Sequence, residues 1–353
     1  MMNIKLAKEA IDSLIAKARI HFYKPIQIAE ILYYDRTQGP IDLLDKETYR
    51  NPSKKWRDRI CLEFLGRTST SSAKYQDDLF NDNAIPPDIL SILGKENREK
   101  KGAVEAYIYK QFINRYSQMI KGIDYCRDNK PDTFDVIQFI DLFWHTPGLR
   151  RSIDKVYEIV VYALFSSILN ALNIKIDVSV DESKLDILNE FEDFTQKVIN
   201  LSSTNKSFSL EAKINRLGVT NAADRGLDMW ANFGLAIQVK HLTLNEEMAE
   251  DVVSQVSADR IVIVCKSIEK KSITSLLNQI GWKSRIQSII TEDELVDWYE
   301  KALRGDYSDL IGDRLIKEIQ SEVMVEFPAS DSTVINAFLK SRAYDKIKDN
   351  MWK

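Results

Sequence analysis

The sequence contains few of the residues that build disulfide-stabilised or zinc-stabilised folds. Its 353 residues include 3 cysteines and 3 histidines, and all of them lie far apart in the chain. Scattered cysteines exclude a disulfide framework and a cysteine zinc cluster, and dispersed histidines exclude an HExxH metal site. Neither GxxxxGK[ST] nor GxGxxG occurs, so the sequence predicts no nucleotide cofactor.

Long apolar runs are also scarce. The first 20 residues are amphipathic and rich in lysine, without the apolar region of a signal peptide. The longest apolar run spans residues 156–172 and is interrupted by Glu158 and by three small polar residues. One interrupted run predicts a buried helix rather than a membrane anchor. We therefore expect a cytoplasmic protein in a reducing compartment, with no membrane partner.

The length of the chain predicts more than one hydrophobic core. Residues 1–145 show mainly helical periodicity, whereas residues 146–305 alternate between helices and short strands. Pro147 and Gly148 end an apolar helical segment and mark the boundary between the two regions. We expect a mainly helical N-terminal domain for DNA recognition, an α/β (α+β) core, and a helical C-terminal extension over residues 306–353.

Within the α/β region the pattern predicts a mixed sheet flanked by helices. Strands are expected at residues 174–180, 227–231, 235–240, 260–265 and 285–290. Helices are expected at residues 151–173, 184–201, 246–257, 273–280 and 292–303.

Charge is segregated along the chain although the net charge is only −4. Residues 50–75 carry seven positive and two negative charges, and residues 95–121 carry seven and three. Residues 181–193 carry one positive and six negative charges. An acidic protein binds DNA when its basic residues share one face, so the average does not exclude a nucleic-acid partner.

The segment 66–76 (GRTSTSSAKYQ) is small, hydroxylated and basic. It is typical either of a solvated loop or of a loop that approaches a phosphate backbone. On the second interpretation, the candidate DNA contacts here and in the preceding basic segment are Lys54, Lys55, Arg57, Arg67 and Lys74.

The segment 224–240 carries the residues most suited to catalysis. Asp228 opens one predicted strand, a turn reverses the chain, and Gln238, Val239 and Lys240 close the next strand. Residues two apart in a strand share a face, so Gln238 and Lys240 point the same way and a hairpin brings Asp228 beside them. The alternative is a surface aspartate that caps a hairpin whose Gln and Lys face solvent.

This set of groups suits phosphodiester hydrolysis. The Asp228 carboxylate, the Gln238 amide oxygen and the Val239 carbonyl are hard oxygen ligands appropriate to Mg²⁺. Lys240 would orient the attacking water and offset charge that develops on the phosphate. Residues 235–239 are apolar enough for an interior strand, where an unpaired lysine is costly, and this favours a functional role for Lys240.

The segment resembles the PD-(D/E)xK nuclease superfamily, with Asp228 as the motif aspartate and Gln238-Val239-Lys240 in the place of (D/E)xK. Gln238 departs from the acidic residue of the motif and removes one negative ligand, which puts binding of two metal ions in doubt. The segments KARIHFYKPIQIAEILYYDR, GRTSTSSAKYQ and ADRGLDMWANFGLAIQVKH resemble the HaeII-type restriction endonucleases. The resemblance covers most of the chain.

The resemblance implies a restriction-endonuclease-like core and a Mg²⁺-dependent type II enzyme that cuts the palindrome purine-GCGC-pyrimidine in double-stranded DNA. A palindromic target requires two active sites related by a two-fold axis, hence a homodimer. Two alternatives stay open: another nuclease of the superfamily (methylation-dependent, repair or junction-resolving), and a non-catalytic DNA-binding protein with a degenerate core.

Further candidates lie near the motif. In the superfamily the first core helix often carries a glutamate that reaches the metal, and Glu158 matches this position; the alternative is an exposed glutamate on that helix. Glu211 is a weaker candidate because its segment predicts no clear element. His241 would contact a phosphate or simply end a strand, and Gln255 would face the site only with a favourable helix phase.

Overall fold

The computed structural model describes residues 2–18, 21–69, 72–144, 153–217, 227–256, 258–268, 286–327, 332–348 and 352. The protein is mixed α and β with a helical N-terminal region, which confirms the predicted fold class. The predicted boundary at Pro147 and Gly148 and the predicted helix at residues 273–280 lie outside the described residues.

The chain forms two compact units. The first unit contains Met1–Asp128, Gln138–Ile153 and Val323–Lys353, and the second contains Asn129–Ile137 and Asp154–Glu322. The C-terminal residues therefore cluster with the N-terminal helices rather than with the segment that precedes them.

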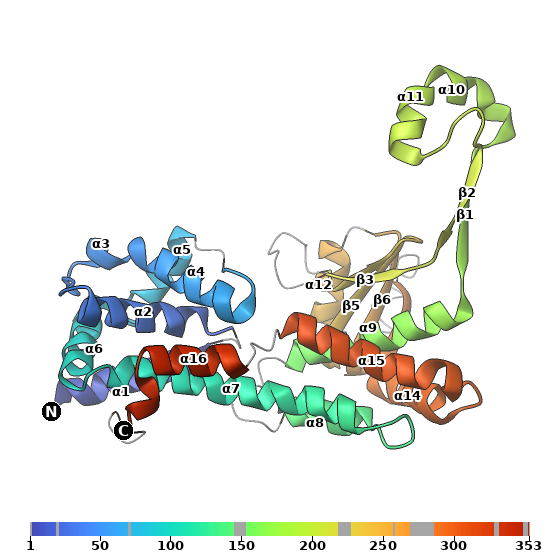
Figure 1. The fold of residues 1–353 in the computed structure, drawn as a ribbon. Helices are drawn as coiled ribbons and strands as arrows, with labels where there is room; N and C mark the ends of the chain where they lie inside the picture. The colour runs from blue at the N-terminus through green and yellow to red at the C-terminus, as the bar shows by residue number, and fades with distance from the viewer. Residues whose placement is uncertain are drawn as a thin grey trace. The chain divides into compact units, whose positions relative to one another are not determined.

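The first unit is helical (Figure 1). Prolines at the first turn of two helices and Gly66 in the left-handed region (φ 64°) at the end of another set their boundaries. Its helices are α1 (Met2–Lys17), α2 (Tyr23–Thr37), α3 (Lys46–Tyr49), α4 (Pro52–Leu65), α5 (Ala73–Leu79), α6 (Pro87–Glu99), α7 (Ala103–Asp128), most of α8 (Val136–Trp144) and α16 (Ser332–Ser341).

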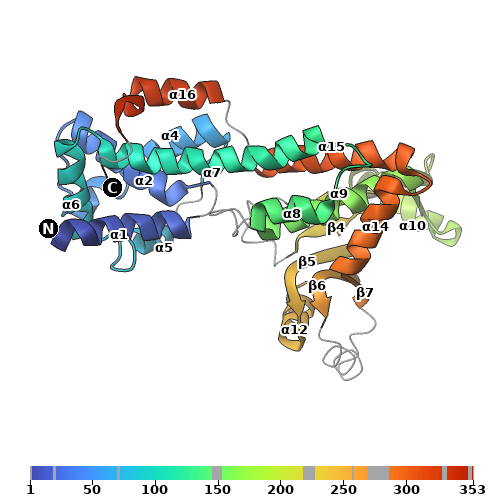
Figure 2. The same ribbon diagram turned by 90° about the horizontal axis from the view of Figure 1, so that it is seen from below.

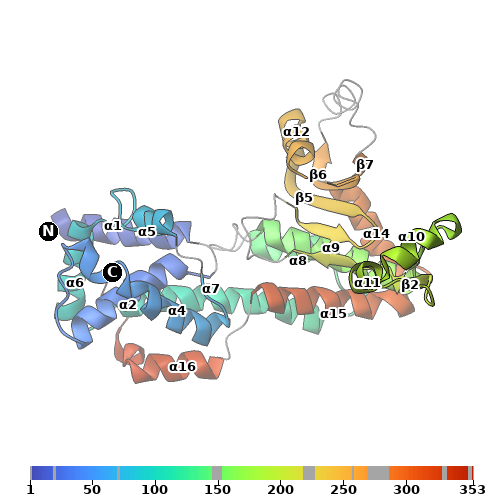
Figure 3. The ribbon, with the colours of Figure 1, turned by 90° about the horizontal axis from the view of Figure 1, so that it is seen from above.

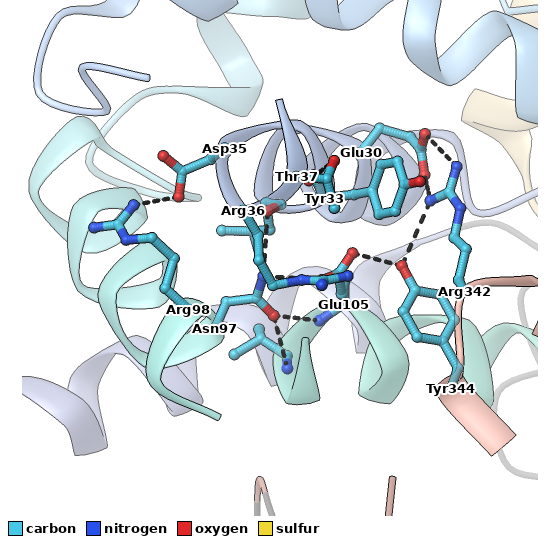
Figure 4. Close-up of polar contacts among 12 residues, drawn as sticks. Glu30, Tyr33, Asp35, Arg36, Thr37, Asn97, Arg98, Glu105, Arg342 and Tyr344 are labelled. Carbon is cyan, nitrogen blue, oxygen red and sulfur yellow. Dashed lines mark hydrogen bonds and ion pairs between the residues drawn. The ribbon is translucent and has the colours of Figure 1, made fainter. Parts of the chain in front are cut away.

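A buried polar network joins the C-terminal residues to α2 and α7 (Figure 4). Arg342 Nη1 and Nη2 donate to the two carboxylate oxygens of Glu30 at 2.5 and 3.0 Å. The Tyr344 hydroxyl donates to Glu105, which also accepts from Arg36 Nε. Glu30 and Glu105 are fully buried, so each carboxylate depends on these donors for compensation of its lost hydration.

The second unit is built on α9 (Ile153–Leu172) and a five-stranded sheet. The strands are β3 (Ile214–Arg216), β4 (Met229–Ala231), β5 (Leu235–Leu244), β6 (Arg260–Ile268) and β7 (Ile286–Thr291) in that order across the sheet. The first two pairings are antiparallel, and β5, β6 and β7 are parallel and lie side by side in Figure 2. The described helices after the hairpin are α12 (Glu246–Gln255), α14 (Glu292–Arg304) and α15 (Ser308–Glu326).

The parallel strands are apolar because helices cover them. Ala236 and Ile263 belong to one buried cluster with Val252 of α12, which lies alongside β5 and β6 in Figure 3. A parallel sheet with covered faces requires continuous apolar strands, and RIVIVC in β6 is such a run. The Tyr299 hydroxyl of α14 donates to the Val160 carbonyl at 2.7 Å, which ties α14 to α9.

Helix α9 is long and apolar enough to span a membrane by length and composition. Within the structure, 56% of its apolar window is buried, and Val156, Tyr157 and Ile159 are fully enclosed. The prediction of a buried core helix is confirmed.

The strand expected at 174–180 is confirmed as β1 (Lys175–Ser179), but it lies outside the five-stranded sheet and pairs with β2 (Ser207–Glu211). The other expectation for residues 174–211 was wrong. The helix expected at 184–201 is broken into α10 (Leu185–Glu190), α11 (Glu192–Phe194) and a π-turn at Thr195–Ile199. Strand β2 (SFSLE) was not predicted, although Phe208 and Leu210 alternate with polar residues as in a strand. We call residues 174–211 the arm.

Candidate active site

The hairpin of β4 and β5 brings the predicted motif together. Gly234 has a φ of +83°, which lets the chain reverse after Ala231, and the Gly234 amide donates to the Ala231 carbonyl at 3.0 Å. Met229 pairs with Ile237, so the residue before Met229 lies opposite the residue after Ile237. This register places Asp228 beside Gln238.

Two donors from β5 hold the Asp228 carboxylate. Gln238 Nε2 donates to Asp228 Oδ2 at 2.5 Å, and the Val239 amide donates to the same oxygen at 2.8 Å. The predicted proximity of Asp228 to Gln238 and Val239 is therefore confirmed, and the carboxylate is fixed in one orientation. Asp228 is not a hairpin cap in solvent: it is half-buried, and Gln238 is 3% exposed.

Glu158 completes a pair of carboxylates. It lies in the second turn of α9, is 4% exposed, and accepts hydrogen bonds from Lys155 Nζ at 2.8 and 2.6 Å. Burial and the nearby Asp228 raise the pKa of Glu158 to about 7, against the opposing effect of Lys155. Burial also raises the pKa of Asp228, against the opposing effects of the Val239 amide, of the nearby lysines and of a hydrogen bond with Glu158. The interpretation of Glu158 as an exposed helix residue is thereby excluded.

The Gln238 side chain leaves one oxygen unused. Its Oε1 is buried and has no hydrogen-bond partner among the residues that the structure describes. A buried amide oxygen without a donor costs free energy unless a cation or water satisfies it. The same described part of the chain contains no group of three His, Cys, Asp or Glu side chains arranged as a metal site. Asp228, Glu158 and the Gln238 oxygen form a donor set suited to one hard cation with water ligands.

Lys240 follows on the same face of β5 and is half-buried. Its ammonium stabilises the ionised form of Asp228 and opposes the effect of burial on the Asp228 pKa. His241 points to the opposite face, is 8% exposed, and packs edge-on against Tyr157 with ring centroids 4.9 Å apart. Burial lowers the pKa of His241. This corrects the expectation that His241 contacts DNA, because the ring belongs to the core.

The two other candidates do not join this set. Glu211 lies in the arm, is exposed, and forms an ion pair with Lys213 at 3.6 Å. Glu158 rather than Glu211 is therefore the second acid near Asp228. Gln255 is the last residue of α12, and its side chain lies outside the described part of the structure.

Two basic residues near the acids were missed in the sequence. Lys155 lies three residues before Glu158 on α9, and this spacing on a helix could have indicated the pair. Arg216 of β3 is 5% exposed at its side chain, donates to Glu322 at 2.8 Å, and lowers the pKa of Glu158. No sequence pattern indicates Arg216, because β3 is only three residues long.

The predicted DNA contacts of the first unit differ in accessibility. Arg57 is fully buried: its Nη1 donates to Gln27 at 3.1 Å, and its Nη2 donates to the Ser69 carbonyl at 3.4 Å. Its ion pair with Asp58 completes the contacts of the guanidinium. The prediction of Arg57 as a DNA contact was wrong, since this residue anchors the end of the loop that follows α4.

Arg67 is half-buried and donates to His21 Nε2 and to the Glu326 carbonyl. Lys54 is half-buried, and Lys55 and Lys74 are exposed. These three lysines keep accessible charges, so they are the candidates of this segment that a phosphate can reach without repacking of the unit.

Comparisons with known proteins identify the family of the chain. The family model described as HaeII restriction endonuclease matches residues 7–344. The chain belongs to the HaeII restriction endonuclease family. It is 61% identical to the type II restriction enzyme HaeII of Haemophilus aegyptius over 349 residues, 99% of each chain. It is 57% identical to the type II restriction enzyme NgoBI of Neisseria gonorrhoeae over 340 residues, 96% of each chain.

No solved structure matches the chain. The predicted family and enzyme class, a type II site-specific deoxyribonuclease, are confirmed.

Proposed function

We propose that the protein cleaves double-stranded DNA at a short GC-rich palindrome, purine-GCGC-pyrimidine, as a Mg²⁺-dependent homodimer in the cytoplasm. The observation that carries the chemistry is the buried pair Asp228 and Glu158, with the unsatisfied Gln238 oxygen beside it and Lys240 on the same strand. The relatives named type II restriction enzymes support the substrate class.

The groups that would hold Mg²⁺ are the carboxylates of Asp228 and Glu158, the side-chain oxygen of Gln238 and the Val239 carbonyl. When bound, the cation polarises a phosphoryl oxygen and lowers the pKa of a coordinated water. The raised pKa values of both acids fit this role, because two carboxylates in one partly dehydrated space favour the entry of a divalent charge.

Lys240 would hold the attacking water and stabilise charge that develops on the phosphate. An ammonium fixed by a strand acts more on the transition state than on bound DNA, because the extra negative charge appears only during the reaction. Lys155 holds Glu158 in position through its two hydrogen bonds. It is therefore a positioning residue for the acid pair.

DNA binding would depend on the accessible lysines of the first unit and on residues that read base edges in the major groove. Lys54, Lys55 and Lys74 are the proposed phosphate contacts. Phosphate contacts of this kind fix the register of a protein on DNA and make affinity fall steeply with salt.

Digestion of a sequenced plasmid with Mg²⁺, followed by mapping of the ends, tests the proposal. We expect double-strand breaks at purine-GCGC-pyrimidine, no cleavage in EDTA, and no cleavage by Asp228→Ala. The Lys213→Ala variant, which removes an exposed basic residue outside the acid pair, serves as the control and should cut normally. Cleavage by Asp228→Ala at the rate of the native protein would overturn the site assignment.

A further inference from the structure

The arm exposes an unusual amount of apolar surface. Seven large apolar side chains in these 38 residues are between 40% and 67% exposed: Ile174, Ile187, Phe191, Phe194, Val198, Ile199 and Leu210. Roughly 100 Å² of each is open to water, so the arm offers on the order of 700 Å² of apolar surface. For comparison, the largest contiguous apolar patch on a typical monomer is ~300–600 Å².

The ribbon of the arm has an apolar side that the described residues leave partly exposed. Ile176 pairs with Leu210 and Val178 with Phe208 across β1 and β2, and these four side chains share one side of the ribbon. Neither strand contains a buried residue. A two-stranded ribbon without a covered face is marginally stable in water. The apolar side therefore suits a ribbon that is covered in the working assembly.

The tip of the arm, residues 185–199, also exposes apolar side chains. Figure 1 shows the ribbon leading to the short helices α10 and α11. Phe194 and Val198 are four residues apart in the helical turns that end at Ile199, and Phe191 immediately precedes these turns. All three side chains are more than half exposed, whereas Leu188 and Thr195 are buried within the tip.

The charge of the arm indicates a protein partner rather than DNA. Residues 174–211 carry eight acidic and four basic side chains, a net charge of −4. DNA phosphates and anionic membranes repel such a surface. A protein surface that carries basic side chains is attracted to the arm instead.

We propose that the arm is a dimerisation element whose apolar side and tip pack against a second copy of this chain. The inference rests on the proposed function, because cutting a palindrome requires two sites related by a two-fold axis. The exposed area is close to the ~800 Å² per partner of a standard interface. Two reciprocal arms in a symmetric dimer double the buried area.

The position of the arm in the chain links this contact to the active site. The arm begins two residues after α9, which carries Glu158, and ends three residues before β3, which pairs with β4. The side-chain Nδ2 of Asn232, in the turn of the catalytic hairpin, donates to the Glu211 carbonyl at 2.9 Å. The arm is therefore connected directly to α9 and β3, the elements that lie beside Glu158 and the catalytic hairpin.

Sedimentation velocity of the full chain from about 1 nM to about 50 μM tests the inference, because interfaces of standard area have dissociation constants from micromolar down to picomolar. We expect the native protein to sediment at twice 40.7 kDa. The variant Phe191→Ser/Phe194→Ser/Val198→Ser should dissociate at concentrations at least 100-fold higher than the native protein. On a one-site plasmid it should give nicked circles, because a monomer has one active site.

The control variant is Leu242→Ser/Tyr307→Ser/Leu310→Ser, which removes apolar side chains of comparable exposure from the same unit outside the arm. It should stay dimeric and make double-strand breaks. Dissociation of the control to the same extent, or an arm variant that stays dimeric, would overturn the inference. An arm variant that stays dimeric but loses DNA affinity would assign the arm to DNA instead.

Hydrogen exchange of the native protein provides a test that needs no variant. Amides of β1 and β2 should exchange more slowly at about 50 μM than after dilution to a concentration at which sedimentation shows the monomer. Equal exchange in dimer and monomer would reject the arm as the interface. A native protein that cuts plasmid DNA but stays monomeric with cognate DNA would also reject it, while the proposed nuclease activity would stand. Absence of plasmid cleavage from a dimeric native protein would reject the activity alone.

Discussion

The substitution Gln238→Glu distinguishes a metal site from a purely structural pair, because it acts in opposite directions with and without a cation. In the structure Gln238 Nε2 donates to Asp228 Oδ2 at 2.5 Å, and Gln238 is 3% exposed. A glutamate at this position replaces the donor with a second carboxylate. The variant also restores the acidic residue of the (D/E)xK motif.

The magnitude follows from the distance. Two carboxylates about 3 Å apart repel by roughly 5 kcal/mol at an effective dielectric constant near 20. Protonation of one of them relieves the repulsion, but holding a glutamate protonated at neutral pH costs about 4 kcal/mol relative to its ordinary pKa near 4.3. The smaller of these two costs sets the loss, so we expect Gln238→Glu to lower the free energy of unfolding of the second unit by roughly 3–4 kcal/mol in EDTA.

Thermal unfolding with EDTA and with Mg²⁺ measures this effect. For a unit of this size about 3 kcal/mol lowers the Tm by on the order of 10 °C. Mg²⁺ should recover most of the loss, and each tenfold gain in affinity adds about 1.4 kcal/mol at saturating cation. We expect the Mg²⁺-induced rise in Tm to be larger in the variant than in the native protein.

The swapped variant Asp228→Asn/Gln238→Glu is the matched control. It again pairs one amide with one carboxylate, so its Tm in EDTA should return toward that of the native protein. The reasoning is refuted if Gln238→Glu has the Tm of the native protein in EDTA and shows the same rise in Tm with Mg²⁺. In that case Asp228 and Gln238 do not share a cation site.

Three further outcomes are expected. Lys240→Ala should reduce kcat by roughly 100- to 1,000-fold with unchanged affinity for cognate DNA in Ca²⁺, and full activity would contradict its role. Replacing Lys54, Lys55 and Lys74 by Ala should reduce the slope of log affinity against log salt by about 5.4, because each protomer of the dimer loses three contacts, whereas an unchanged slope in a filter-binding titration would remove them from the interface. Arg342→Met should destabilise the first unit by about 3–5 kcal/mol in chemical denaturation, because it leaves a buried carboxylate unpaired; a change below 1 kcal/mol (roughly the value of an exposed pair) would show that the pair contributes little.

Much of the fold class could be predicted from the sequence, because the patterns that indicate helices, strands and turns are local. The apolar run RIVIVC, the helical period of the N-terminal region and the turn Asn232-Phe233-Gly234 depend on neighbours in the chain. The proximity of Asp228 to Gln238 was predictable for the same reason, since a short hairpin connects them. Family membership was likewise predictable from three sequence segments, and the family model confirms it.

Contacts between residues distant in sequence were not predictable in this way. The strand at residues 174–180 has an alternating pattern that fits a main-sheet strand equally well, and only its pairing with residues 207–211 shows that it belongs to the arm. Arg57 reads as one member of a basic surface segment. Its burial against Gln27 and Ser69 depends on how α2 packs against α4.

The sequence by itself determined the hairpin motif, because a ten-residue separation and a tight turn leave Asp228 and Gln238 little freedom to separate. Tertiary structure alone decided which acid stands beside that motif. Glu158 is 70 residues away from Asp228 and reaches it because α9 packs against the sheet. Glu211 is only 17 residues away, but it ends strand β2 of the arm, where its side chain is exposed and pairs with Lys213. Distance along the chain predicts contact only within a local element; between elements, the burial of apolar faces decides which polar groups meet.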